Sequence, residues 1–337
     1  MKQEFYNISL LGRNSFGLDQ RASKIVEFDS VEDLVEIFSV DPPAEWYVLS
    51  GGNNVLFTQD YQGVIITPTA TSIEIVSSNR AECRVRVAAG VEWDDFVEWC
   101  VENELWGAEN LSMIPGKVGA APIQNIGAYG VEAKDIISEV EMFCPATLNS
   151  LTLHGQYCDF GYRDSIFKRS LRGRVIITSV VFTLSRVAAP NLGYGDVVSE
   201  VAARGELTLK SIREAICAIR SSKLPDPAVT GNAGSFFKNP VVEASVADAI
   251  LEQYPDMPVY PLKSDPQRVK LAAGWLIDKA GFKGHVDGRV GVHPKQALVL
   301  INLGGATGGE VMALAHTIVA RVEEKFGVAI EPEVNVL

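Results

Sequence analysis

A ten-residue segment in the last third of the chain combines small residues with a hydroxyl, two aromatic rings, a cation and an amide. It runs Gly231-Asn232-Ala233-Gly234-Ser235-Phe236-Phe237-Lys238-Asn239-Pro240. Small residues allow a backbone to bend sharply and to approach another group closely. The density of polar groups favours a strand end beside a ligand over a plain core strand. The alternative is an ordinary turn that enters a strand, with Ser235 capping the turn or in solvent.

Two Gly-rich segments in the first half could bind a phosphate-bearing ligand. Residues 50–56 follow a short apolar stretch, and such a Gly/Asn turn can point several N–H groups at an anion. The segment is neither G-x-G-x-x-G nor a P-loop, so a simple loop is an equal alternative. Residues 114–130 are mostly small, with Lys117, Gln124, Asn125 and Tyr129 as the polar side chains. This bare backbone favours a ligand cradle over a flexible linker, because linkers lack Ile, Val and Tyr.

The composition is that of an ordinary enzyme of two or three domains. The chain has 337 residues, of which 47% are hydrophobic and 21% charged. A formal net charge of −12 argues against nucleic acid or an anionic membrane as a partner. An anionic substrate would therefore need cations gathered locally.

The cysteines, the histidines and the N-terminal residues give no sign of a disulfide framework, a metal site or a signal peptide. The five cysteines include no C-x-x-C pair and indicate free thiols in a reducing compartment. The four histidines have no metal-ligand spacing, so no metal site is expected. Residues 1–17 do not resemble a signal peptide, and the longest apolar run, 175–184, is too short to span a bilayer. A soluble cytoplasmic protein is expected.

The apolar periodicity predicts an α+β architecture. Helices are expected over residues 31–39, 92–105, 208–223, 245–253, 269–280 and 309–326. Strands are expected over residues 46–49, 63–67, 73–75, 83–88, 140–144, 151–153, 175–184 and 297–302. Pro225 and Pro227 end the helix over 208–223, and a domain boundary is expected near its start.

Eight short segments, in order along nearly the whole chain, resemble the signatures of the type I UDP-N-acetylenolpyruvoylglucosamine reductases, flavoenzymes of peptidoglycan precursor synthesis. They are Asn14-Ser15-Phe16-Gly17, Gly51-Gly52-Asn53-Asn54-Val55-Leu56, residues 114–130, Gly161-Tyr162-Arg163-Asp164-Ser165, Lys223-Leu224-Pro225-Asp226-Pro227, residues 231–240, Ala272-Ala273-Gly274-Trp275-Leu276-Ile277 and Glu331-Pro332-Glu333-Val334. Residues 191–196 resemble the tyrosine loop of type I members.

The resemblance implies an α+β fold of three domains. Residues 1–68 and 69–207 would form two FAD-binding subdomains of the vanillyl-alcohol-oxidase type. Residues 208–327 would form an α/β substrate-binding domain, and residues 328–337 would return as a strand to the second subdomain. The resemblance also implies FAD as cofactor, NADPH as co-substrate and a monomer.

It also implies sites residue by residue. The cofactor-binding residues would be Ser50, Gly51, Gly52, Asn53, Asn54, Val55, Pro115, Gly116, Val118, Gly119, Gln124, Asn125, Ala128 and Gly130. The substrate-binding residues would be Tyr129, Tyr194, Lys223, Asn239, Tyr260, Lys270 and Gln296. Lys270 is expected to lie on the helix over residues 269–280.

The implied reaction reduces the enolpyruvyl ether of UDP-N-acetylglucosamine to the D-lactyl ether, giving UDP-N-acetylmuramate. Hydride delivery to the β-carbon leaves negative charge that is delocalised into the carboxylate. Arg163 would hold this carboxylate bidentately, and Glu333, if protonated, would assist. Ser235 would protonate the α-carbon, with Lys223 or Asn239 stabilising its alkoxide.

Two residues depart from the family pattern, and two other functions compete with this one. Lys117 replaces a small residue near the expected FAD diphosphate, and Asn335 replaces an arginine that follows Glu333. A flavin oxidase of the same fold would not need Ser235 as a proton donor. A sugar-nucleotide-binding regulator that has lost its flavin would be expected to have a disrupted segment 116–130, whereas this segment is intact here.

Overall fold

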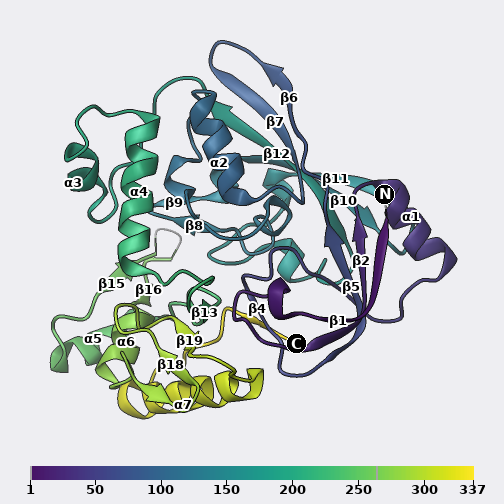
Figure 1. Cartoon of the computed structure of the whole chain (residues 1–337). Coiled ribbons are helices and arrows are strands. Elements are labelled where there is room, and N and C mark those ends of the chain that lie inside the picture. The colour runs from purple at the N-terminus through teal and green to yellow at the C-terminus, as the bar shows by residue number, and fades with distance from the viewer. Residues whose placement is uncertain (1, 263–264) are drawn as a thin grey trace. The chain divides into compact units, whose positions relative to one another are not determined.

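The computed structural model describes residues 2–262 and 265–337 and divides into two compact units (Figure 1). Neither unit is continuous in sequence. Unit 1 consists of residues 1–8, 22–51 and 62–222. Unit 2 consists of residues 9–21, 52–61 and 223–337. The chain therefore passes between the units several times before residue 223.

The first sheet of unit 1 lies almost wholly within residues 3–68. Its strand order is β1-β2-β5-β3, where β1 is Gln3–Ser9, β2 is Arg21–Phe28, β3 is Trp46–Val48 and β5 is Tyr61–Pro68. Helix α1, Val31–Val40, begins at Ser30, whose hydroxyl accepts a hydrogen bond from the Asp33 N–H at 3.2 Å. Its buried Leu34 packs with Val26 and Ile66 of the sheet. The apolar spacing of α1 thus explains how this helix covers its sheet.

The second sheet of unit 1 is antiparallel and carries the larger core. Its strand order is β11-β10-β12-β7-β6, with β6 at Ile73–Ser78, β7 at Glu82–Ala88, β10 at Ile137–Cys144, β11 at Asn149–His154 and β12 at Ile176–Ser185. Helix α2, Trp93–Glu102, lies beside β7 and β12 in Figure 1. Its Phe96 ring stacks on Phe182 of β12 with centroids 4.5 Å apart. A short hairpin, β8 (Gly127–Ala128) and β9 (Val131–Glu132), lies at the end of residues 114–130. This segment is called the bare loop below, because most of its side chains are small.

Helices α3 (Val197–Ala202) and α4 (Leu209–Lys223) complete unit 1. Arg213 of α4 binds both carboxylate oxygens of Asp94 on α2, at 2.6 and 3.0 Å. The predicted start of the third domain at residue 208 therefore needs correction. Nearly all of α4 belongs to the first compact unit, because this bidentate pair and the buried face of α4 attach the helix there.

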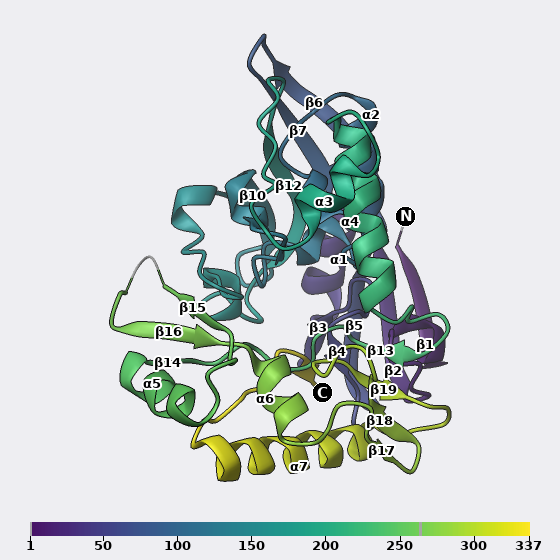
Figure 2. The same cartoon turned by 90° about the vertical axis from the view of Figure 1, so that its left-hand side faces the viewer.

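The described residues of unit 2 form two small antiparallel sheets and three α-helices. One sheet has the order β13-β19-β18-β17, with β13 at Gly231–Asn232, β17 at Val286–Asp287, β18 at Val290–Val292 and β19 at Leu300–Asn302. The other has the order β14-β16-β15, with β14 at Val241–Glu243, β15 at Val259–Pro261 and β16 at Arg268–Leu271. The helices are α5 (Ala244–Gln253), α6 (Ala273–Lys279) and α7 (Gly308–Phe326). Figure 2 shows α7 running beneath α6 and beneath the sheet that contains β18 and β19.

Segments from the N-terminal part of the chain complete the core of unit 2. Phe16, Leu18 and Leu56 are fully buried among the side chains of α6 and α7. The Asn302 amide donates to the Phe16 carbonyl at 2.8 Å. Strand β20 (Asn335–Val336) pairs in parallel with β4 (Val55–Leu56). The C-terminal strand therefore does not return to residues 69–207, as the sequence suggested, because its backbone partner is the segment after the Gly/Asn turn.

The α+β class is confirmed, and most predicted elements are present. The helix expected over 269–280 is the main error, since residues 268–271 form β16 and the helix begins at Ala273. Strands β1 and β2 were not predicted, because polar residues interrupt their apolar positions. Within residues 2–262 and 265–337, no helix is long and apolar enough to cross a membrane.

Candidate active site

The bare loop of unit 1 has left-handed backbone conformations at several positions. The φ angles are +109° at Gly116, +47° at Asn125, +48° at Tyr129 and +81° at Gly130. For a tyrosine this conformation costs roughly 1–2 kcal/mol, so surrounding contacts must hold it. Gly119 has a different role, because a Cβ there would lie 2.6 Å from the Cβ of Ala89. Its small size therefore serves packing within unit 1.

Asn125 organises this loop from the inside. Its side chain is fully buried and donates to the Gly161 carbonyl at 3.0 Å and to Glu132 at 3.1 Å. Its Oδ1 accepts the Lys134 N–H at 2.9 Å. The amide is thus engaged within the protein. Its contribution to the site is to fix the loop against the segment that carries Arg163.

Arg163 lies against the same loop. Its Nη2 donates to the Gly127 carbonyl at 2.8 Å, and its own φ is +54°. The guanidinium carbon lies 5.6 Å from the centroid of the Tyr162 ring. A guanidinium has five N–H donors in a planar fork. The backbone carbonyl therefore sets the orientation of a group suited to binding a carboxylate.

Tyr129 and the tyrosine loop are joined by Asn110. The Asn110 Nδ2 donates to the carbonyls of Tyr129, at 2.9 Å, and of Asn191, at 2.8 Å. The rings of Tyr129 and Tyr194 meet edge to face with centroids 6.0 Å apart. The structure thus brings together two residues that the sequence assigned to substrate binding.

In unit 2, the segments of Ser235 and Glu333 pair with each other. The Glu333 N–H donates to the Phe236 carbonyl at 2.7 Å, and Phe237 forms an antiparallel bridge with Pro332. Phe236 and Phe237 are both buried and fix this pairing in the core. Ser235 is exposed and Glu333 is half-buried. Two predicted catalytic residues separated by almost a hundred positions thus lie on neighbouring backbone segments.

The other predicted substrate ligands of unit 2 lie around β16 and α6. Tyr260 and Lys270 are cross-strand partners, and the Lys270 Nζ lies 5.7 Å from the Tyr260 ring centroid. Lys270 is on strand β16, so its expected place on a helix was wrong. Asn239 accepts the Ala273 N–H at 2.9 Å, at the first turn of α6. A Cβ at Gly274 of α6 would lie 3.4 Å from Oε1 of Gln296.

The Gly/Asn turn, residues 50–56, contributes residues to both units. In unit 1, the Ser50 Oγ is buried without a hydrogen-bond partner among the described residues. In unit 2, Gly52 has φ +67°, and a Cβ there would lie 2.1 Å from the Arg13 carbonyl oxygen. The Asn54 carbonyl accepts hydrogen bonds from both the backbone and the side chain of Asn335. Glycine at position 52 is therefore required by close backbone packing.

Two domain models and several full-length relatives match this chain. Residues 226–337 match the model of the UDP-N-acetylenolpyruvoylglucosamine reductase C-terminal domain, and residues 22–147 match that of an FAD binding domain. A UDP-N-acetylenolpyruvoylglucosamine reductase of Bacteroides fragilis is 46% identical, with 99% of each chain covered. One of Neisseria meningitidis is 45% identical, with 98% of this chain and 96% of the relative covered.

The chain belongs to the UDP-N-acetylenolpyruvoylglucosamine reductase family. The crystal structure of a UDP-N-acetylenolpyruvylglucosamine reductase from Thermus caldophilus covers all of this chain and 98% of its own, with a TM-score of 0.69. At 21% identity this likeness concerns the fold alone. The resemblance inferred from the sequence motifs is thereby confirmed.

The residues of unit 1 fit the flavin that the family model implies. The buried, unpartnered Ser50 hydroxyl can bond a polar ligand. The left-handed positions of the bare loop include Gly116 and Gly130, which have no side chain. At glycine, a ligand such as the flavin can approach the backbone closely. The assignment of individual cofactor contacts, from Ser50 to Gly130, stays a prediction.

The two departures from the family pattern have local explanations. Lys117 forms an antiparallel bridge with Glu92, and its Nζ lies 3.9 Å from the Glu92 carboxylate. Asn335 donates its amide to the Asn54 carbonyl at 3.0 Å. Asn335 therefore supports the Gly/Asn turn, and Lys117 makes a surface ion pair of small energetic value.

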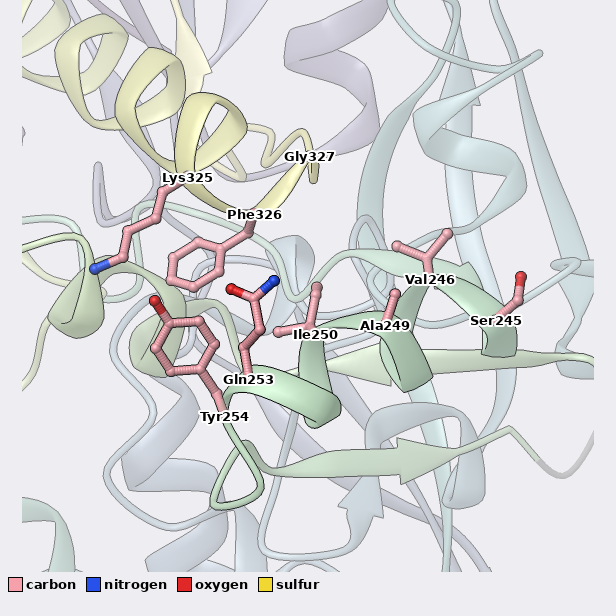
Figure 3. Close-up of a pocket in the computed structure, with 9 residues that line it drawn as sticks. All are labelled: Ser245, Val246, Ala249, Ile250, Gln253, Tyr254, Lys325, Phe326 and Gly327. Atoms are coloured by element: carbon pink, nitrogen blue, oxygen red, sulfur yellow. The ribbon is translucent and has the colours of Figure 1, made fainter.

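A pocket of about 410 Å³ in unit 2 contains none of the predicted site residues (Figure 3). It lies between α5 and the C-terminal end of α7. The Lys325 ammonium donates to the Lys279 carbonyl and lies near the Tyr254 and Phe326 rings. The lining residues are Ser245, Val246, Ala249, Ile250, Gln253, Tyr254, Lys325, Phe326 and Gly327.

Sequence reasoning missed two polar residues of unit 1. Asn110, which holds Tyr129, gave no signal because it stands alone in a loop. Arg220 could have been noticed, because it follows the buried Ile216 by four residues and therefore lies on the apolar face of α4. Arg220 is partly buried, and its Nε has no hydrogen-bond partner among the described residues.

Proposed function

We propose that this chain is an FAD-dependent UDP-N-acetylenolpyruvoylglucosamine reductase that uses NADPH in the cytoplasm. It would reduce the enolpyruvyl ether of UDP-N-acetylglucosamine to the lactyl ether of UDP-N-acetylmuramate. The observation that carries the proposal is 46% identity to a curated reductase over 99% of both chains. The backbone pairing of the Ser235 and Glu333 segments supports it independently.

The proposal gives unit 1 the roles of cofactor binding and carboxylate orientation. Residues 50–51 and 115–130 would hold FAD, which supplies two-electron hydride chemistry when bound. Arg163 would bind the substrate carboxylate with its guanidinium fork, and its contact with the Gly127 carbonyl fixes the orientation of that fork. A fixed charge-assisted donor stabilises the negative charge that develops on this carboxylate without reorganising during the reaction.

The proposal gives unit 2 the roles of proton donation and phosphate binding. Ser235 would donate its hydroxyl proton to the α-carbon of the substrate, and Glu333, in its protonated form, would hydrogen-bond the carboxylate. Ser235 is a suitable donor because its neighbours Phe236 and Phe237 are buried and immobilise the segment while Ser235 is exposed. Tyr260, Lys270 and Gln296 would hold the nucleotide, a role also proposed for Tyr194 of unit 1, and Lys223 or Asn239 would stabilise the alkoxide that Ser235 becomes.

An anaerobic spectrum of the purified protein tests the reaction class. Bound flavin should lose its visible absorbance on addition of NADPH and regain it on addition of the enolpyruvyl substrate. A flavin that is reduced but ignores the substrate would favour an oxidase of the same fold. A protein that neither contains nor takes up FAD would refute the proposal.

Ser235→Ala separates the proton donor from the rest of the machinery. Reduction of the flavin by NADPH should be unaffected, because that half-reaction needs no proton from Ser235. Reoxidation by substrate should be lost, since the α-carbon then lacks its donor. Stopped-flow absorbance measures both half-reactions in one sample. Equal loss of the two would show that Ser235 has a structural role.

A further inference from the structure

Asn110 is a buried amide whose side chain donates to two separate segments of unit 1. It is 1% exposed, and its Nδ2 donates to the Tyr129 carbonyl at 2.9 Å and to the Asn191 carbonyl at 2.8 Å. An amide nitrogen carries two hydrogens, so these two bonds use both of them. Its Oδ1 has no hydrogen-bond partner within residues 2–262 and 265–337. The two carbonyls therefore fix the direction of this amide.

The tyrosine loop, residues 191–196, makes further contacts with the end of the bare loop. Asn191 donates its Nδ2 to the Gly130 carbonyl at 3.2 Å. Gly130 has φ +81°, and a Cβ at this position would lie 3.6 Å from both the Asn191 Nδ2 and the Tyr194 Cβ. The tyrosine loop thus lies directly against the backbone of the bare loop.

Two tyrosines from these loops meet and are supported by the same helices. The rings of Tyr129 and Tyr194 lie edge to face with centroids 6.0 Å apart. Tyr129 and Leu192 both pack against the buried apolar residues of α3 and α4. The φ of Tyr129 is +48°, a conformation that a tyrosine keeps only where its surroundings hold it. The bond from Asn110 to the Tyr129 carbonyl is part of that support.

The tyrosine loop depends on a small number of such contacts. Residues 186–196, all of which the structure describes, contain no helix or strand. Segments with few buried contacts open at a low free-energy cost. The bond from Asn110 to the Asn191 carbonyl comes from a buried donor, which is shielded from competition by water. Asn110 is therefore well placed to decide how often this loop opens.

We propose that Asn110 is a positioning residue that couples the tyrosine loop to Tyr129, so that Tyr129 and Tyr194 bind the substrate together. The inference rests on the proposed function for the roles of the two tyrosines. Asn110 acts through the two backbone carbonyls, because both of its donor hydrogens are used within the protein. A loop that is already held loses less conformational entropy when the substrate binds, so the coupling should lower KM.

Steady-state kinetics of Asn110→Asp in the full-length, FAD-loaded protein test this role. Aspartate has the same size but, even when protonated, carries one donor hydrogen instead of two. KM for the enolpyruvyl substrate should rise about tenfold, whereas kcat should change less than about twofold, because the coupling serves binding and not the chemical step. Asn103→Asp is the matched control, since Asn103 is exposed and donates to the Trp99 carbonyl at 2.8 Å. It should leave both constants unchanged.

Limited digestion with chymotrypsin measures the release of the tyrosine loop without any substrate. Tyr194 is 51% exposed and Tyr157 is 59% exposed, so the protease can reach both side chains. The cleavage rate of a loop follows the population of its open form where opening and closing are fast. Asn110→Asp should speed cleavage after Tyr194 about tenfold and leave cleavage after Tyr157 unchanged. Mass spectrometry of the fragments follows both sites in one digest.

Asn191→Ala is a second variant that should fold normally, because the Asn191 side chain is exposed. It removes the bond to the Gly130 carbonyl and keeps the backbone carbonyl that Asn110 binds. Both effects should therefore appear in weaker form, at about two- to fivefold. This variant decides the test if Asn110→Asp loses its flavin or melts several degrees lower than the wild type. Unchanged KM and unchanged cleavage in Asn191→Ala would then overturn the inference.

Two results with a folded Asn110→Asp would overturn the inference alone. KM could equal that of the wild type, which would show that the coupling does not serve the substrate. Alternatively, cleavage after Tyr157 could accelerate as much as cleavage after Tyr194, which would indicate a general loss of structure. If the wild-type protein does not turn over the enolpyruvyl substrate, the proposed function fails and this inference fails with it. That failure is distinguishable because it appears before any substitution is made.

Discussion

At the scale of single residues, buried amides rather than charges organise the candidate site. Asn125 and Asn110 each tie two chain segments together through backbone carbonyls. A buried amide that lost these partners would leave several backbone groups unsatisfied, at about 1–3 kcal/mol each. The reactive side chains can therefore project from loops that are as well fixed as regular structure. This precision is what positioning of a substrate requires.

Arg163→Lys tests whether the shape of the guanidinium matters in addition to its charge. Lysine keeps the charge but cannot bind a carboxylate through a planar fork. Loss of a hydrogen bond to a charged group, at about 1.5–3 kcal/mol, predicts a fall in turnover of about 10- to 100-fold. Steady-state kinetics measure it, with Arg169→Lys as control, because Arg169 is paired with Asp159 at the surface. Near-native turnover in Arg163→Lys would contradict the carboxylate role.

Glu109 provides a pH-dependent prediction. It is 3% exposed, and burial raises its pKa above the usual value although the Gly107 N–H donates to it at 2.6 Å. A raised folded-state pKa means that the folded protein binds the proton more tightly than the unfolded chain. Its contribution to stability is thus complete below the unfolded pKa and is lost as pH rises through the folded pKa.

Glu109→Gln should therefore reduce the loss of stability between acid and neutral pH. Urea denaturation at a series of pH values measures the effect, and Glu102→Gln, an exposed carboxylate nearby, is the control. Glutamine keeps the acceptor for Gly107 and has no proton to lose. An unchanged pH profile in Glu109→Gln would show that the buried carboxyl group is already satisfied in its ionised form.

The sequence identifies site residues that lie in short motifs, but not residues whose role depends on contacts with distant parts of the chain. Ser235, Glu333 and Arg163 could be selected because short motifs carry them. Asn110 could not be selected, because its function depends on two carbonyls that lie 19 and 81 positions away. Hydrogen bonds to distant backbone groups leave no local pattern in the sequence. The backbone pairing of the segments that carry Ser235 and Glu333 is likewise visible only in the structure.

At the scale of elements, strong periodicity and capping signals made helices predictable. Helix α7 begins with a capping box in which Thr307 accepts the Glu310 N–H and Glu310 accepts the Thr307 N–H. It ends at Gly327, whose φ is +66°. By contrast, the segment over 269–280 is predicted as one helix from its sequence. Its apolar residues fit both a strand and a helix, and pairing of β16 with β14 and β15 makes residues 268–271 a strand.

Thr307→Ala tests how much the cap contributes to unit 2. Loss of the side-chain acceptor should cost about 1 kcal/mol of unfolding free energy, because an N–H of the first turn is left unsatisfied. Thr317→Ala is the matched control, since Thr317 is exposed within the same helix and bonds the Ala313 carbonyl. It should be neutral or slightly stabilising. Equal losses in the two variants would mean that the capping box contributes nothing specific.

At the scale of the whole molecule, the boundaries of the sequence match and of the folded unit differ. The C-terminal family model begins at residue 226, but unit 2 also contains residues 9–21 and 52–61. Those segments supply Phe16, Leu18 and Leu56 to its core and the strand that pairs with β20. Contacts of this kind join residues almost three hundred positions apart, so no local periodicity could have predicted them.

A fragment of residues 223–337 should consequently fail to fold cooperatively. Removing a single buried leucine or phenylalanine side chain costs about 2–5 kcal/mol, and three are missing from a unit whose total stability is of order 5–15 kcal/mol. The expected result is a broad thermal transition by circular dichroism and strong binding of a hydrophobic dye. Phe16→Ala in the full chain is the graded control, because it removes one of the three side chains and should lower the melting temperature of a still folded protein. A sharp transition of the fragment close to that of the full chain would show that unit 2 does not need its N-terminal segments, and that their burial in its core is incidental to stability.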